Sequence, residues 1–274
     1  MKKILVPTDF SDTSKNAARY AISMARSLPG ASVVLYHLSD KIALGSDSSP
    51  VTESDEDRKL IVGAALENMQ DELNAPDVPI TNVSEGGSSL VECLSRYIRH
   101  KGMDVVVMGI TGATRLEQIF MGSNALDMVK ENVCPVIIVP PNATYREIKN
   151  VLFTTDFKNV ESTTPIASIK KLLNTFKPML HVVNVDHEHF VEVTEEYKAE
   201  RVKLESMLQE FRPQFYFIRM YDFLDAISAF TADHNIDLIV TVPRKHNFLT
   251  GLYKTSHTKK LAYHSHVPIA AVHE

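Results

Sequence analysis

Three glycines and a serine recur at fixed distances after an apolar run in residues 103–123, MDVVVMGITGATRLEQIFMGS. The pattern G-x-x-G, nine residues, G-[ST] contains Gly109, Gly112, Gly122 and Ser123. Glycines can adopt positive φ, and without a Cβ they let backbone N–H groups approach phosphate oxygens closely. Ser123 opens a helical segment, so its hydroxyl and the helix N-terminus would face the same anion. The spacing predicts a phosphate-binding loop, and a plain long turn is the alternative.

Alternating strands and helices are expected to hold this loop in position. The residues after Asp104 are continuously apolar, which is typical of a strand buried on both faces. In the first half we expect strands at 3–6, 32–38, 80–84, 104–108 and 136–139, and helices at 13–28, 57–73, 88–100 and 124–132. This alternation predicts a parallel sheet with helices on both faces and with ligands at the carboxyl ends of its strands.

The second half of the 274-residue chain repeats the first. IKNVLFTTDF at 148–157 matches MKKILVPTDF at 1–10, IDLIV at 236–240 matches MDVVV at 103–107, and VPIAAV at 267–272 matches CPVIIV at 134–139. A chain of 274 residues is too long for one small sheet domain and suits two domains of similar size. Because consecutive prolines do not continue a central strand, Pro140 and Pro141 mark the boundary between predicted domains 1–141 and 147–274.

The glycine loop, together with the opening KKILVPTDFSDTSKNA, resembles the nucleotide-binding signature of the universal stress protein family. The resemblance covers nearly the whole chain. It implies an α/β fold of two tandem doubly wound parallel five-stranded sheets, strand order 3-2-1-4-5, of the adenine nucleotide alpha hydrolase-like type. It also implies that the last strands of the two copies, PVIIV and PIAAV, pair within the chain, and that a further contact between chains forms a homodimer.

The resemblance further implies an adenine nucleotide as ligand, either ATP or bound AMP or ADP, with accompanying Mg²⁺ left open. In ATP-binding members the positions of Pro7, Thr8 and Asp9 line the adenosine, and the aspartate accepts from ribose hydroxyls. Leu38 would pack on the adenine. The other binding positions implied, from the sugar to the terminal phosphate, are Met108, Gly109, Thr111, Gly112, Arg115, Gly122, Ser123 and Asn124. For Asp9 the alternative is a plain turn residue before a helix.

The second copy has lost most of the loop pattern. At an offset of 133 residues the three glycines are replaced by Val242, Lys245 and Thr255, and Ser256 alone keeps its type. A β-branched side chain does not readily take positive φ, and these side chains would fill the space meant for phosphate. We therefore predict that the second half does not bind nucleotide. Its basic segment 243–260 is either a solvated loop or a site for another anion.

Composition argues against several other classes. The net charge of −5 argues against nucleic acid as a partner. The sequence contains no run of 18 apolar residues, so no membrane-spanning helix is expected. The chain enters a strand at once, so we expect the cytoplasm. Cys93 and Cys134 fit neither a disulfide framework nor a metal motif. The H-x-H pairs at 187–189 and 264–266 lack an identifiable third ligand, so no metal is predicted.

No catalytic residue is predicted either. The chain has no G-x-x-x-x-G-K-[ST] motif and no G-x-G-x-x-G after its first strand, and no residue is identified as a base. The leading hypothesis is a cytoplasmic ATP-binding sensor or regulator of the stress response. The alternatives are a slow ATP hydrolase or phosphotransferase, and an interaction scaffold without ligand. The acidic, serine-rich segment 41–57 is either a surface connection or a lid over the nucleotide.

Overall fold

The structure, a computed structural model, describes residues 1–40, 55–110, 123–186, 195–219, 223–242 and 267–272. The elements of the first half are β1 (Lys3–Pro7), α1 (Asp12–Arg26), β2 (Ser32–Asp40), α2 (Asp55–Leu73), β3 (Ile80–Gly87), α3 (Leu90–Lys101), β4 (Val105–Gly109), α4 (Ser123–Lys130) and β5 (Val136–Val139). All nine predicted elements of this half are confirmed, with ends that differ by at most three residues. The largest difference is at β3, which continues to Gly87 because it pairs with β2 that far.

The second half follows the same plan with one interruption. Its elements are β6 (Asn150–Thr154), α5 (Val160–Thr163), α6 (Ile166–Phe176), β7 (Met179–Asp186), α7 (Glu195–Leu208), the 3₁₀ helix η1 (Gln209–Phe211), β8 (Gln214–Arg219), α8 (Phe223–Asp233), β9 (Leu238–Thr241) and β10 (Ile269–Ala271). Where the first half has the continuous α1, the second has the short α5, then Pro165, then α6. Proline has no N–H to donate and restricts the residue before it, so the helix is divided there.

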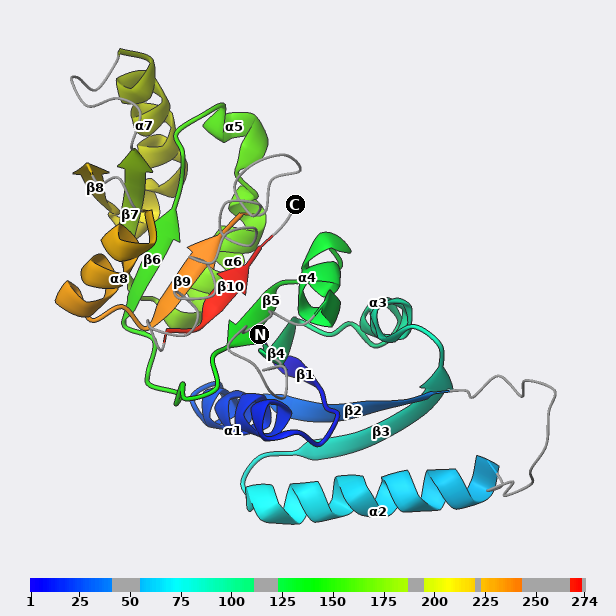
Figure 1. Ribbon diagram of the computed structural model, residues 1–274. Helices are drawn as coiled ribbons and strands as arrows, with labels where there is room; N and C mark the ends of the chain where they lie inside the picture. Colours follow the sequence, from blue (N-terminus) through cyan, green and yellow to red (C-terminus); the bar gives the residue numbers. More distant parts are fainter. Residues whose placement is uncertain (41–54, 111–122, 187–194, 220–222, 243–266, 273–274) are drawn as a thin grey trace.

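The two halves form one ten-stranded sheet in the order β3-β2-β1-β4-β5-β10-β9-β6-β7-β8 (Figure 1). Each half has the predicted order 3-2-1-4-5 with parallel pairing inside it. The central pair, β5 and β10, is antiparallel, with Ile269 opposite Ile138 and Ala271 opposite Val136. The expected pairing of PVIIV with PIAAV within the chain is therefore confirmed, and it joins the two five-stranded sheets into one.

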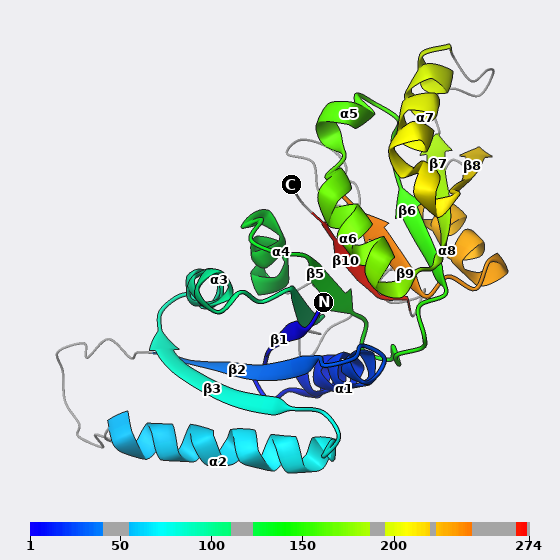
Figure 2. The ribbon, with the colours of Figure 1, turned by 180° about the vertical axis from the view of Figure 1, so that it is seen from behind.

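Helices cover both faces of this sheet. Helices α1 and α2 lie on one face of the first half and α3 and α4 on the other (Figures 1 and 2). The core accordingly forms two layers that each run through both halves. One contains buried residues of α1, α2, α6 and α7, and the other contains those of α3, α4 and α8. β4, β5 and β9 are buried almost throughout, as expected for strands covered on both faces. None of the described helices is long and apolar enough to cross a membrane.

Local sequence explains where the helices next to the first-half strands begin and end. The Ser11 hydroxyl accepts from the Ser14 N–H and caps α1, and Ser89 caps α3 in the same way. Helix α3 ends at Gly102, whose φ of 62° is the left-handed conformation that glycine adopts at little cost. These caps fix the chain as it leaves β1 and β3, so the residues just after those strands have defined positions.

Polar contacts tie the two halves together beside the β5–β10 pair. The Asn16 side chain on α1 donates to the carbonyl oxygens of Pro140 and Ala143, at 3.0 and 3.1 Å. Across the halves, the Lys171 ammonium lies 2.7 Å from Asp104 Oδ1. Burial alone would raise the pKa of Asp104, but hydrogen bonds from Lys171 and from the backbone N–H groups of Lys2 and Lys3 lower it to about 2. The carboxylate is thus held in its charged form.

We expect the Asp104–Lys171 pair to contribute about 0.5–1 kcal/mol to the free energy of unfolding at neutral pH, because it is partly exposed. A double-mutant cycle of Asp104→Asn and Lys171→Met measures this coupling. The folded pKa lies below the unfolded value of about 3.9, so the stabilisation is complete above that value and is lost as the pH falls toward 2. A coupling energy that does not change between neutral and acidic pH would contradict this assignment.

Candidate functional site

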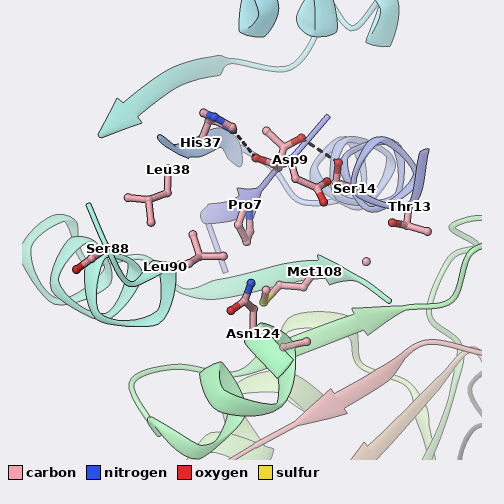
Figure 3. Close-up of a pocket in the computed structure, with 13 residues that line it drawn as sticks. Pro7, Asp9, Thr13, Ser14, His37, Leu38, Ser88, Leu90, Met108 and Asn124 are labelled. Atoms are coloured by element: carbon pink, nitrogen blue, oxygen red, sulfur yellow. Dashed lines mark hydrogen bonds between the residues drawn. The ribbon is translucent and has the colours of Figure 1, made fainter. Parts of the chain in front are cut away.

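A cavity of about 340 Å³ lies at the carboxyl ends of β1, β2 and β4 (Figure 3). This edge of the sheet, where β1 and β4 are neighbours and their chains leave for opposite faces, is where doubly wound folds bind ligands. The residues that line the cavity are Pro7, Thr8, Asp9, Thr13, Ser14, His37, Leu38, Ser88, Leu90, Met108, Gly109, Asn124 and Ala125. They come from β1, α1, β2, α3, β4 and α4 and from the connections next to them, so segments far apart in the first half form the site together.

The turn after β1 holds Asp9 at the mouth of this cavity. The Thr8 hydroxyl accepts from the Phe10 N–H at 3.0 Å, and Asp9 Oδ1 accepts from both the N–H and the hydroxyl of Ser11. Phe10 has a φ of 64°, an unusual conformation for a residue with a large side chain, and these hydrogen bonds hold it. Burial alone would raise the pKa of Asp9, but the hydrogen bonds from Ser11 lower it overall. Asp9 is therefore an exposed carboxylate acceptor near neutral pH.

His37 is a further polar residue of the cavity. Its Nδ1 lies 2.9 Å from the Thr8 carbonyl oxygen, which can only accept, so Nδ1 carries the hydrogen and Nε2 of the neutral ring is an acceptor. The ring also lies against Phe10, with centroids 4.7 Å apart. Leu38, the next residue, packs against the core layer that contains buried residues of α3, α4 and α8. The signal for His37 in the sequence is slight: a single polar residue near the end of an apolar strand.

Gly109 is needed for close approach of helix α1. A Cβ at this position would lie 2.4 Å from the carbonyl oxygen of Thr13 and 2.7 Å from its carbonyl carbon. Its φ is not in the left-handed region, so this glycine does not use the conformational freedom of glycine. The absence of a side chain lets the first turn of α1 pack directly on the end of β4.

Seven of the twelve predicted binding residues line the cavity together: Pro7, Thr8, Asp9, Leu38, Met108, Gly109 and Asn124. The other loop positions, Thr111, Gly112, Arg115 and Gly122, lie outside the described residues. The same holds for both H-x-H pairs and for residues 41–54 of the segment 41–57, for which a surface connection and a lid are the alternatives. Ser123 is the first residue of α4. Sequence reasoning missed six lining residues, which are Thr13, Ser14, His37, Ser88, Leu90 and Ala125.

The second half repeats the turn of the first almost bond for bond. The Thr155 hydroxyl accepts from the Phe157 N–H at 3.2 Å, and Asp156 Oδ1 accepts from the Lys158 N–H at 3.0 Å. Phe157 has a φ of 49°. Asn184 takes the place of His37 and donates from Nδ2 to the Thr155 carbonyl oxygen at 2.9 Å. The turn is therefore a structural feature of both halves, whatever each half binds.

The described residues of the second half do not repeat the cavity. The corresponding space in the second half is about 10 Å³, no more than the minimum that one water molecule needs. It is bounded by residues of β6 and the turn after it, by Thr163 and Thr164 beside the interrupted helix, and by Val242. Val242 occupies the sequence position of Gly109 and packs against the core. Among the described residues, the two halves thus share a turn and differ in whether a ligand-sized space exists.

The described residues contain no cluster of three or more His, Cys, Asp or Glu side chains that could hold a metal ion. Around the first-half cavity the ionisable side chains that the structure describes are Asp9 and His37. Apolar walls from Leu38, Leu90 and Met108 complete it. This combination suits an uncharged flat ring with hydroxyl groups attached better than it suits a metal complex.

Comparison with known proteins agrees with this architecture. The profile of the Universal stress protein family matches residues 1–140. A universal stress protein of Methanocaldococcus jannaschii is 34% identical over 143 residues, which are 50% of this chain and 81% of that protein. A solved universal stress protein from Archaeoglobus fulgidus matches 98% of this chain and 97% of its own, with a TM-score of 0.70 and 16% identity. A putative universal stress protein from Pseudomonas aeruginosa matches 99% and 93%, with a TM-score of 0.61 and 12% identity.

The two kinds of match differ in extent. The curated relative of Methanocaldococcus jannaschii spans half of this chain, whereas the two solved structures span nearly all of it. One half of this chain is therefore equivalent to a single-domain relative, and the fold of the whole chain is shared with other chains. The chain belongs to the universal stress protein family, as a tandem member with two domains of the same fold.

Proposed function

We propose that this chain binds one adenine nucleotide, which is ATP, ADP or AMP, in its first half. The second half is then a domain that completes a pseudo-dimer with the first and binds no nucleotide. The observation that carries the proposal is the difference between about 340 Å³ of lined space after β1 and β4 and about 10 Å³ at the equivalent position. The larger volume falls in the range of small-molecule sites. The smaller one leaves no room for a base or a sugar.

The chemistry of the lining supports a nucleoside. Leu38, Leu90 and Met108 offer apolar surface to a flat base, and in Figure 3 Pro7 lies between Leu38 and Asp9. The Asp9 carboxylate can accept hydrogen bonds from two vicinal ribose hydroxyls, the kind of donor that a charged acceptor binds strongly. Helix α4 begins beside the cavity at Ser123 and Asn124, and its N-terminal N–H groups favour an anion such as phosphate.

We propose binding without rapid turnover. Of the described lining residues only Asp9 and His37 are ionisable, and each takes part in the turn: Asp9 Oδ1 accepts from Ser11, and His37 Nδ1 donates to the Thr8 carbonyl. We assign the remaining acceptor capacity of Asp9 to the ribose hydroxyls, and we assign no described lining residue to the activation of a water molecule. A role as sensor or regulator in the stress response, in which the nucleotide is a ligand, therefore fits the site better than a role as hydrolase.

The proposal extends to surroundings and assembly. Cys93 and Cys134 are free thiols, which supports a reducing compartment such as the cytoplasm. Burial raises the pKa of the Cys134 thiol to about 12, so it stays protonated and unreactive.

Because β5 and β10 pair with each other inside the chain, the homodimer that we propose has to use another surface. Light scattering of the purified chain measures that assembly directly.

The test of the proposed function is the nucleotide content of the protein itself. We expect heat or acid to release adenine nucleotide from freshly purified chain, and calorimetric titration of the emptied protein to give one nucleotide per chain. Incubation with ATP for hours should yield little ADP. Absence of both endogenous nucleotide and measurable binding would favour the scaffold interpretation, and steady release of ADP would favour the hydrolase.

A further inference from the structure

A second cavity, of about 590 Å³, lies at the amino ends of β9 and β10 in the second half. Three separate parts of the chain form it: the connection between the halves, the end of α8 with the turn into β9, and the residues before β10. The lining residues are Asn142, Thr144, Arg146, Ser228, Thr231, Ala232, Asn235, Ile236, Asp237, Val267 and Pro268. Most are polar. Nothing in the nucleotide proposal uses this cavity.

Asp237 in this cavity has a structural twin in Asp104 of the first half. Each lies directly before the fourth strand of its half, and each accepts from the backbone at the start of the first strand. Asp104 Oδ2 accepts from Lys2 and Lys3 at 2.9 and 3.2 Å. Asp237 Oδ2 accepts from the N–H groups of residues 149 and 150, both at 2.9 Å. One oxygen of each carboxylate thus has the same structural role.

The other oxygen distinguishes the twins. Asp104 Oδ1 binds the ammonium of Lys171 at 2.7 Å. For Asp237 Oδ1 no cation of the described residues forms such a contact: Lys149 is near enough to interact electrostatically, but its own ammonium lies 2.9 Å from Glu147. Instead Asp237 lines the cavity. Asp104 therefore shows which group this carboxylate position accepts, and at Asp237 no residue that the structure describes supplies it.

Arg146 provides the opposite charge in the same cavity. It is exposed and forms no ion pair with another described residue. A guanidinium group presents a rigid set of donors that matches a carboxylate. Neutral polar groups of Asn142, Thr144 and Asn235 lie in the lining with these two charges. A cavity with one carboxylate and one guanidinium that do not pair with each other suits a molecule with both charges.

We propose that this cavity binds a small zwitterion, with a primary ammonium against Asp237 Oδ1 and a carboxylate against Arg146. Amino acids and short peptides are the class that carries both groups. The volume is within the range of small-molecule sites and leaves room for a short peptide or an amino acid. The site is separate from the first-half cavity in sequence and in lining residues, so binding here and nucleotide binding are independent claims.

A homologous series of ligands tests the two-ended contact. Glycine, β-alanine, 4-aminobutyrate, 5-aminovalerate and 6-aminohexanoate have the same end groups at increasing separation, and ligand-observed NMR with the full chain measures their binding. We expect one length to bind best, and to bind about tenfold more tightly than pentylamine or pentanoate, which each lack one end. Equal binding of the single-ended compounds, or no binding by any member of the series, would overturn the proposal.

Two variants and a matched control locate the site. Asp237→Asn keeps an oxygen for the two backbone N–H groups but removes the charge, and Arg146→Gln removes the guanidinium. Each should weaken binding of the best ligand about tenfold, the loss of one charged hydrogen bond. Asp104→Asn makes the same change in the first half, where the carboxylate already forms an ion pair with Lys171. This variant should leave ligand binding unchanged. An equal loss in Asp104→Asn would show that the effect is structural and contradict the proposal.

Discussion

Gly109→Val is expected to reduce the affinity for adenine nucleotide by at least about 100-fold, because the larger side chain disturbs several contacts of the cavity and not a single one. A Cβ at residue 109 would lie 2.4 Å from the Thr13 carbonyl oxygen, so α1 has to move away from β4. Thr13 and Ser14 on the first turn of α1 line the cavity with Gly109 itself. The substitution gives the first half the residue that the second half already has, and calorimetric titration measures the result.

Val242→Gly is the matched control for this prediction. It removes a side chain at the equivalent position of the second half, where the proposal assigns no nucleotide. Nucleotide affinity and stoichiometry should stay as in the unchanged chain. Circular dichroism establishes that both variants are folded, and Gly109→Ala, which adds a single carbon, gives a milder version of the same change. Unchanged affinity in Gly109→Val would contradict the assigned site.

Asp9→Ala is expected to weaken nucleotide binding about 10- to 100-fold, since a charged hydrogen bond contributes roughly 1.5–3 kcal/mol. Asp9→Asn keeps an oxygen to accept from Ser11 and so preserves the turn, but loses the charge that we assign to the ribose hydroxyls. Its loss should be smaller, about tenfold. The Asp9→Asn variant should also discriminate less between ATP and 2′,3′-dideoxy-ATP, which carries no ribose hydroxyls.

Asp156→Ala is the corresponding control in the second half. Asp156 accepts from the Lys158 N–H as Asp9 does from the Ser11 N–H, so it shares the structural role of Asp9. A loss of stability common to both alanine variants reports that role. Loss of nucleotide affinity in Asp9→Ala alone reports binding, and equal loss in both would assign the effect to the fold.

Much of the architecture follows from the sequence because its signals are local or repeated. The apolar runs that became β4, β5 and β9 are buried on both faces, and the matches between the halves predicted two copies of one strand order. The join between the copies was expected from two short apolar strands together with the family resemblance. Strand ends were less accurate: β3 continues to Gly87 only because β2 is long enough to pair with it.

The site was predicted in outline and for a partly different reason. Gly109 was identified from its spacing to other glycines and assigned to phosphate contact. The structure gives it a second requirement, which is the approach of Thr13 from a helix that begins about a hundred residues earlier in the chain. Such a contact between distant segments has no periodic or local signature. His37 was missed for the same reason, because its partner is the carbonyl oxygen of Thr8 in the turn after the neighbouring strand β1.

The difference between the halves was predictable in direction but not in mechanism. Replacement of Gly109 by Val242 at the equivalent position indicated a blocked site. The structure adds Thr163 and Thr164 to its boundary, beside the division of the helix at Pro165. The cavity at Asp237 had no signal in the sequence, because its walls come from three segments that are far apart along the chain. Only the fold brings them together.

The most direct test of the central claim is a crystal structure of the full chain grown with a non-hydrolysable ATP analogue. We expect one nucleotide per chain, with its base against Leu38 and Met108, its ribose hydroxyls on Asp9, and its phosphates toward the start of α4. The space beside Val242 should hold no ligand. A nucleotide bound in the second half, or a first-half cavity that stays empty at saturating analogue, would contradict it.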